Sequence, residues 1–237
     1  MPVATANVPV RKAPRAKAKP KGKAKAGASA KARTRKMAAD PTKPLLAEVR
    51  LKKEYRCFAE GQVLGFRPGV NLLVGEQGAG KSSLLSVVRR MGDRLEMTRE
   101  QARETIAITA QACPMHSFDF EKENTRTQSY FGDNIGFQVA SMFSSHGETT
   151  NAMLALFCKE FTSEKEPSLI LLDEPDMALS PRSAHLLAKI FAGIGASGHQ
   201  VIASVHNPIV IASQEEVLSL EHGKWMSSEA FLDDHAS

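Results

Sequence analysis

The sequence predicts an α/β fold with a mostly parallel central sheet, flanking helices and an antiparallel β portion on its N-terminal side. Two short apolar runs, "PSLILLDEP" and "HQVIASVHNP", are typical of strands buried on both faces of a parallel sheet. Between them, "SPRSAHLLAKIFAGIGASG" has a serine cap, a proline in its first turn and glycines beyond its end, which predicts a helix. A third apolar run, "VNLLV", leads through a glycine-rich loop into another helical pattern.

The other folded segments can be assigned in chain order. Residues 45–58 alternate well enough for one or two strands, and residues 105–110, "TIAITA", for another. Residues 93–102 are helical and polar, whereas residues 148–161 have helical period with one apolar stripe. Residues 216–225 close the chain as a strand or hairpin. The polar stretch 113–134, interrupted by aromatic residues, receives no assignment.

A basic tail precedes the folded domain. Residues 1–39 contain twelve Lys or Arg and no Asp or Glu, whereas the rest of the chain holds 19 basic and 26 acidic side chains. Ala, Pro, Gly and Ser fill most of the tail, so it has too little apolar surface to offset the entropy of ordering. We therefore expect a disordered tail over residues 1–44 and a folded domain over residues 45–237.

The tail resembles the lysine-alanine-proline tails of linker-histone-like proteins. A chain of this charge releases counterions from a polyanion, which favours salt-sensitive contact with DNA or RNA. The alternatives are a solubilising extension, an organelle-type presequence, or a wrongly assigned start codon, with Met37 as the true start. Contact with nucleic acid would make the protein nucleoid-associated.

The composition indicates a soluble protein, with 42% hydrophobic and 24% charged residues. No apolar run approaches the roughly 18–20 residues that span a bilayer, so we expect no membrane insertion and a cytoplasmic location. Three cysteines, widely spaced and without a Cys-x-x-Cys pair, indicate neither a disulfide framework nor a zinc site. They are Cys57, Cys113 and Cys158.

The glycine-rich loop is the strongest chemical signal in the chain. "GEQGAGKS", Gly75 to Ser82, satisfies the pattern G-x-x-x-x-G-K-[ST] between an apolar strand and a helix. Its backbone amides can surround phosphates, Lys81 reaches the β and γ phosphates, and the Ser82 hydroxyl ligates magnesium. The predicted nucleotide contacts are Gly75, Glu76, Gln77, Gly78, Ala79, Gly80, Lys81, Ser82 and Ser83.

Two strand ends supply the remaining chemistry. The run "LILLDEPD" delivers Asp173 and Glu174 to the carboxyl end of a buried strand, where ligands of open α/β sheets collect. Asp173 is the expected magnesium partner and Glu174 the expected base that orients the attacking water. In "VIASVHNP", His206 emerges at the same sheet edge, and we interpret it as a γ-phosphate sensor.

These motifs, with "DMALSPR" after the acidic strand, resemble those of the ABC-type ATPases in order and spacing over most of residues 46–222. That family carries a Ser-Gly-Gly-Gln signature at a helix N-terminus, and here the matching place holds "SHGE", residues 145–148. Such signatures are typical of small soluble ATPases often labelled AAA-family. Ser145 and Gly147 match the signature, whereas His146 replaces a glycine and Glu148 replaces the glutamine.

The resemblance implies a homodimer with ATP between its protomers. Ser145, Gly147 and Glu148 would contact the nucleotide bound to the other protomer, although a plain helix cap at Ser145 or Thr149 is the alternative. Gln111, after "TIAITA", falls where the family has a magnesium-contacting glutamine. The loop containing Asp176, Leu179 and Ser180 would run along the dimer interface.

The function predicted is therefore that of a soluble ATPase with ATP and magnesium as cofactors and Lys81, Glu174 and His206 as catalytic residues. It would close into a homodimer around ATP and couple turnover to a protein partner or a nucleic-acid process. One alternative is a nucleic-acid-binding, nucleoid-associated protein whose ATPase head is switched by nucleotide. A second is a P-loop kinase for a small metabolite, which leaves "SHGE" and His206 unexplained.

Overall fold

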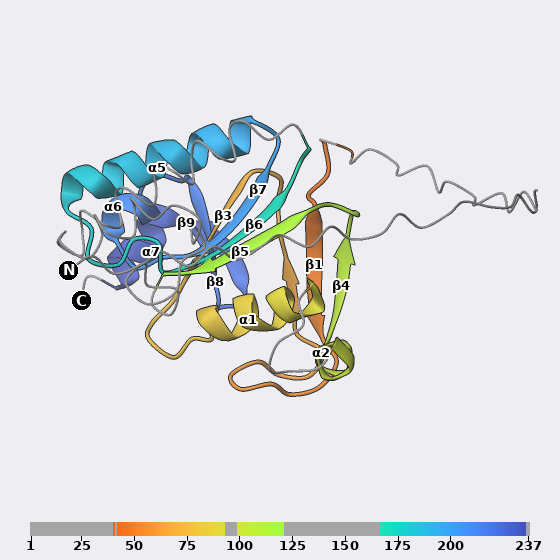
Figure 1. Ribbon diagram of the computed structural model, residues 1–237. Coiled ribbons are helices and arrows are strands. Elements are labelled where there is room, and N and C mark those ends of the chain that lie inside the picture. The colour runs from red at the N-terminus through yellow and green to blue at the C-terminus, as the bar shows by residue number, and fades with distance from the viewer. Residues whose placement is uncertain (1–39, 41, 93–98, 121–165, 236–237) are drawn as a thin grey trace, which may run out of the picture. The chain divides into compact units, whose positions relative to one another are not determined.

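The computed structural model describes residue 40 and residues 42–92, 99–120 and 166–235 (Figure 1). The chain divides into two units, Met1–Lys36 and Met37–Ser237, and every described residue belongs to the second. Residues 1–39 and 41 of the predicted tail and the helix expected over residues 148–161 lie outside the described residues, as does Cys158. The proposed boundary between residues 44 and 45 stays a prediction.

Among the described residues, the main sheet has six strands in the order β5-β6-β7-β3-β8-β9, and all neighbours except β8 and β9 pair in parallel. This confirms the predicted mostly parallel sheet. Its strands are β3 (Val70–Val74), β5 (Met115–Asp119), β6 (Leu169–Asp173), β7 (Gln200–Ser204), β8 (Glu216–Ser219) and β9 (Lys224–Ser227).

Helices cover both faces of this sheet (Figure 1). Helix α5 (Pro181–Ala196) packs on one face and α1 (Lys81–Gly92) on the other. The strands divide their side chains between the two faces, because successive residues of a strand point in opposite directions. In β6, Ile170 and Leu172 join the cluster under α5, whereas Leu169 and Leu171 join the cluster under α1. The unbroken apolar runs in the sequence reflect this burial on both faces.

A second, antiparallel sheet, with three strands in the part of the chain that the structure describes, contains residues that precede and follow α1. Its order is β2-β1-β4, formed by β1 (Leu46–Leu51), β2 (Val63–Gly65) and β4 (Ile106–Ala110). The inner side chains of β1 belong to the same apolar cluster as α1. The expected antiparallel β portion is thereby confirmed, although one of its strands comes from after α1.

Buried polar contacts connect the small sheet to the main one. The Gln200 amide, at the start of β7, accepts from the Leu46 backbone N–H at 2.6 Å and donates to the Leu46 and Arg67 carbonyls, each at 2.9 Å. At another point, the Trp225 indole donates to the Gly65 carbonyl, and the Arg67 guanidinium lies 4.2 Å from the Trp225 ring centroid. The Gln200 hydrogen bonds satisfy backbone groups of residues 46 and 67 that burial would otherwise leave unpaired.

Sequence patterns located most of the described elements. The Ser180 hydroxyl accepts from the Ser183 backbone N–H at 3.3 Å, so the predicted serine cap of α5 is present. Residues 216–225 form the β8–β9 hairpin. Helix α2 (Arg99–Thr105) overlaps the predicted helical stretch 93–102 and continues to Thr105, where a strand was expected. The sequence did not predict β5, whose residues "MHSFD" are mostly polar, nor the short helices α6 (Pro208–Ile211) and α7 (Ser228–Asp234).

Within the described ranges, no helix has the length and apolar character needed to cross a membrane.

Candidate nucleotide-binding site

The loop between β3 and α1 has a backbone that only glycine adopts easily. Gly75, Gly78 and Gly80 have φ values of 143°, 93° and 92°. At Gly80 the surroundings are also close, since an added Cβ would lie 2.2 Å from the Cys57 Sγ and 2.8 Å from the Phe58 ring. The loop therefore packs tightly against the segment between β1 and β2, and Gly80 is required there both by its conformation and by space.

Lys81 begins α1 and folds its side chain back over the loop. The residue is 5% exposed, and its Nζ donates to the Gly75 carbonyl at 2.6 Å and to the Glu76 carbonyl at 3.0 Å. Burial lowers the pKa of the Lys81 ammonium, while nearby carboxylates, of which Glu174 contributes most, oppose that shift. Anionic phosphates at the loop would favour the charged form in the same way.

Asp173 lies at the end of β6, within reach of the start of α1. Its Oδ1 accepts from the Ser82 hydroxyl at 3.0 Å and from the Ser204 hydroxyl at 2.6 Å. A serine hydroxyl and a carboxylate beside a phosphate-binding loop fit magnesium, which takes oxygen ligands and is usually held by one or two protein groups plus phosphates and water. Ser82 and Asp173 are the residues that would hold it.

Glu174 and His206 meet at the same edge of the sheet. The His206 Nε2 lies 3.3 Å from the Glu174 Oε1, and their side chains are 46% and 30% exposed. The Glu174 backbone has a φ of 51°, an uncommon value for a residue with a side chain. Its N–H donates to the Ser204 hydroxyl at 2.8 Å, so a side chain of β7 holds this part of the β6 end in place.

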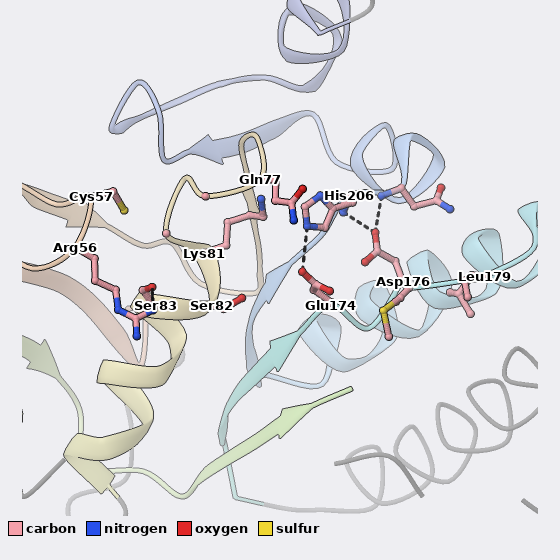
Figure 2. A pocket seen from close by; sticks show the side chains of 15 residues that line it. Arg56, Cys57, Gln77, Lys81, Ser82, Ser83, Glu174, Asp176, Leu179 and His206 are labelled. Carbon is pink, nitrogen blue, oxygen red and sulfur yellow. Dashed lines mark hydrogen bonds and ion pairs between the residues drawn. The ribbon is translucent and has the colours of Figure 1, made fainter. Parts of the chain in front are cut away.

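Lys81, Glu174 and His206 line one pocket of about 770 Å³ (Figure 2). Arg56 and Cys57, from the segment between β1 and β2, line it without having been predicted, and the Arg56 Nη1 donates to the Ser83 hydroxyl at 2.8 Å. No motif in "EYRCF" indicates this placement, because it results from packing between distant segments. The predicted nucleotide-binding and catalytic residues in the lining are Gln77, Gly78, Gly80, Lys81, Ser82, Ser83, Glu174 and His206. Asp176 and Leu179, expected at a dimer interface, also line it, whereas Asp173 is not among the lining residues.

The structure corrects the expectation for Gln111. Its amide oxygen accepts from the Asp40 N–H at 2.7 Å, and its Nε2 donates to the carbonyls of Asp40, Lys43 and Pro44. Gln111 follows β4, which belongs to the antiparallel sheet, and it is not among the residues that line the pocket. The residue that ends the strand beside β6 is Asp119, in register with Asp173.

The signature residues Ser145, Gly147 and Glu148 lie outside the described residues, and their predicted contact with nucleotide stays a prediction. Among the remaining predicted nucleotide contacts, Gly75, Glu76 and Ala79 belong to the loop itself. The Glu76 backbone N–H donates to the Glu221 carboxylate, which follows β8 and also lies 3.3 Å from the His235 Nε2. The loop is thus contacted from both the N-terminal and the C-terminal parts of the domain.

Comparison with known proteins finds partial relatives in sequence and similar folds among solved structures. No protein-family model matches the chain. Its sequence is 22% identical to the macrolide export ATP-binding/permease protein MacB of Hahella chejuensis over 182 residues, which are 64% of this chain and 28% of MacB. It is 40% identical to the energy-coupling factor transporter ATP-binding protein EcfA2 of Lactobacillus delbrueckii subsp. bulgaricus over 60 residues, 25% of this chain and 21% of that protein. The chain thus matches less than a third of the length of either relative.

The structural comparison identifies the fold. CbiO1 of Clostridium perfringens, part of the ABC transporter complex CbiONQ, superposes with a TM-score of 0.51 over 81% of this chain and 92% of that chain, at 14% identity. The fold is that of an ABC-type ATPase. An ABC-type ATPase domain agrees with the order of strand, phosphate loop, acidic strand end and histidine along this chain. The AAA-family label and the "SHGE" signature stay predictions.

Proposed function

We propose that this ABC-type ATPase domain binds ATP with magnesium and hydrolyses it to ADP and phosphate. The observation that carries the proposal is the meeting of Lys81, Glu174 and His206 in one pocket, although they come from three separate segments of the chain. The relatives that are named as ATP-binding proteins add support.

The proposed binding step uses the loop and the start of α1. Backbone amides of the loop and the Lys81 ammonium bind the phosphates, and ATP replaces the Gly75 and Glu76 carbonyls as the partner of the Nζ. Magnesium, held by Ser82 and Asp173, would neutralise charge on the phosphates. Burial of Lys81 strengthens its attraction to phosphate, since little water screens it.

The proposed chemical step belongs to Glu174 and His206. The Glu174 carboxylate accepts a proton from the attacking water, and the His206 imidazole, 3.3 Å from that carboxylate, can donate to the transferred phosphate. Both side chains are partly exposed, which leaves this side of the pocket accessible to water and to a second protomer. Ser145, Gly147 and Glu148 of another copy would complete the pocket in the proposed homodimer.

Two substitutions test this proposal. Lys81→Ala should weaken ATP binding, because it removes a buried cation from the phosphates. Glu174→Gln should leave ATP binding intact and reduce phosphate release by about 100-fold or more, because the amide is a poor base. Equilibrium binding of ATP and release of inorganic phosphate are the measurements, with multi-angle light scattering to detect a dimer of the Glu174→Gln protein.

Three results would contradict parts of the proposal. Phosphate release that is unchanged by Glu174→Gln would remove this residue as the base. A Glu174→Gln protein that stays monomeric in saturating ATP and magnesium would count against the homodimer. A phosphorylated small molecule in place of inorganic phosphate would identify a kinase.

A nucleic-acid partner is the second proposal, carried by the twelve basic and no acidic side chains in residues 1–39. A tail of this charge binds DNA or RNA with an affinity that falls steeply as salt rises. Deleting residues 1–39 should reduce DNA affinity and flatten its salt dependence, measured by fluorescence anisotropy. If the affinity does not change, the tail is not the nucleic-acid-binding element.

A further inference from the structure

Asp176 holds the backbone that carries His206. It lies two residues after Glu174, in the turn between β6 and α5, and is 4% exposed. Its Oδ2 accepts from the His206 N–H at 2.7 Å and from the Asn207 N–H at 2.5 Å, as the dashed lines in Figure 2 show. Hydrogen bonds to an ionised acceptor are stronger than neutral ones, and two bonds to one oxygen restrict how these amides can move.

Glu174, Asp176 and His206 are linked to one another in a closed ring of contacts. The chain runs from Glu174 to Asp176, the Asp176 carboxylate binds the His206 backbone, and the His206 imidazole returns to the Glu174 carboxylate at 3.3 Å. The two residues that would perform the chemistry are therefore connected twice, once through side chains and once through Asp176. A shift of the His206 backbone would alter the distance between them.

The backbone conformation of the turn between β6 and α5 directs the Asp176 side chain toward the residues that follow β7. Glu174 and Ala178 have φ values of 51° and 57°, and the Met177 N–H donates to the Glu174 carbonyl at 3.2 Å. These bends are uncommon for residues with side chains, and the surrounding contacts must hold them. The hydrogen bonds of Asp176 to two amides of the neighbouring loop are among those contacts.

The second carboxylate oxygen of Asp176, Oδ1, helps to show which segment the side chain holds. Among the described residues, Oδ1 is buried and has no hydrogen-bond partner. Within the described part of the chain, the hydrogen bonds of the Asp176 side chain therefore go to the backbone of residues 206 and 207. A change at Asp176 should act first on the segment that presents His206.

We propose that Asp176 is a positioning residue that holds the His206 imidazole against Glu174 for ATP hydrolysis. This inference rests on the proposed ATPase activity. Asp176 touches neither of the reacting groups with its carboxylate and acts only through the backbone of the loop after β7. Its contribution to catalysis therefore exists only while His206 is present.

The kinetic test compares four variants with the wild-type chain. Asp176→Ala should lower kcat by about ten- to 100-fold with a KM for ATP within about twofold, because small misplacements of a reacting group cost rate. Asp176→Asn keeps one oxygen that can accept from both amides. Its NH₂ takes the place of Oδ1, which accepts no hydrogen bond from the described residues, so this variant should retain most of kcat. Asp176→Ala in a His206→Ala background should cause little further loss. Asp233→Ala, on the exposed face of α7, is the control.

A second measurement does not depend on hydrolysis. The imidazole NMR signal of His206 in the nucleotide-free protein can be assigned by its disappearance in His206→Ala. We expect Asp176→Ala to move that signal, Asp176→Asn to move it less, and Asp233→Ala to leave it unchanged. If wild-type protein releases no phosphate, the proposed ATPase activity fails, while this signal still decides whether Asp176 positions His206.

Two results would overturn the inference. One is an unmoved His206 signal in a folded Asp176→Ala protein. The other is an additive loss of kcat, in which Asp176→Ala slows the His206→Ala enzyme by the same factor as it slows the wild type. If Asp176→Ala does not fold, Asp176→Asn still tests the inference, because a kcat loss in that variant that persists in the His206→Ala background contradicts it.

Discussion

The two sides of the candidate site are built in different ways. The phosphate loop is one continuous stretch, Gly75–Ser82, whose shape depends on glycines with positive φ and on close packing at Gly80. The catalytic side combines the ends of β6 and β7, which are about 30 residues apart in sequence and are held together by the side chains of Ser204 and Asp176. The loop should therefore be sensitive to changes of volume, and the catalytic side to the loss of single hydrogen bonds.

Because of this difference, we expect substitutions in the phosphate loop to change ATP binding and substitutions on the catalytic side to change turnover. Damage to the loop should remove ATP affinity, since the loop amides and Lys81 would contact the phosphates. Damage to the contacts between β6 and β7 should leave affinity in place and reduce turnover, since the Glu174 and His206 side chains lie beyond the loop. Two further substitutions, in order of expected effect, test the comparison.

Gly80→Ala should have the largest effect, because it should disrupt the conformation of the phosphate loop. The new Cβ would lie 2.2 Å from the Cys57 Sγ and 2.8 Å from the Phe58 ring, at a backbone φ of 92° that side chains rarely adopt. We expect a loss of ATP affinity of more than about 100-fold and a loss of stability of about 1–3 kcal/mol, from overpacking and backbone strain. Titration with a fluorescent ATP analogue and urea unfolding measure the two effects.

Gly193→Ala is the matched control for this change. Gly193 lies within α5, and nothing is within 4 Å of its added Cβ. Alanine should stabilise the helix by about 0.5–1 kcal/mol and leave ATP affinity unchanged. Equal losses of ATP affinity in the two alanine variants would mean that the packing at Gly80 has no special importance for the loop.

Ser204→Ala should have the smaller effect and act on the catalytic side. It removes the donor to Asp173 and the acceptor for the Glu174 N–H, at a serine that is fully buried. We expect kcat to fall by about tenfold and stability by about 1–3 kcal/mol, while ATP affinity in the absence of magnesium changes little. Phosphate release and urea unfolding are the measurements.

Ser197→Ala controls for the loss of a serine hydroxyl. Its Oγ donates to the Gly193 carbonyl at the exposed end of α5, and Ser197 is not among the residues that line the pocket. Its activity should equal that of the wild type and its stability should change by less than about 0.5 kcal/mol. If Ser204→Ala reduced ATP affinity as strongly as it reduced kcat, the two sides of the site would not be independent.

Local patterns predicted the elements whose shape depends on neighbours in sequence. The loop from Gly75 to Ser82 was predicted because its glycines and their flanking strand and helix are contiguous. The strands ending at Asp173 and near His206 were predicted from unbroken apolar runs, which burial on both faces of a sheet requires. Strand β5 escaped prediction because its few residues carry little hydrophobic pattern.

Long-range packing explains what the sequence patterns missed. The strand before Gln111 was predicted correctly, yet it pairs antiparallel with β1, and the Gln111 amide contacts residues 40, 43 and 44 instead of lining the pocket. Arg56 and Cys57 line the pocket because the segment between β1 and β2 folds over the loop at Gly80. No local pattern specifies such a contact, since periodicity reports which face is buried and not which segment covers it.

The sequence by itself determined the phosphate loop, the apolar strands, the acidic strand end and the order in which they occur, because each depends on residues that are close along the chain. Only the tertiary structure decided which strand borders β6, which residues cover the loop, and that Asp176 binds the backbone of His206. Those outcomes depend on hydrogen bonds and close packing between segments far apart in sequence, where a difference of a few ångströms separates contact from none.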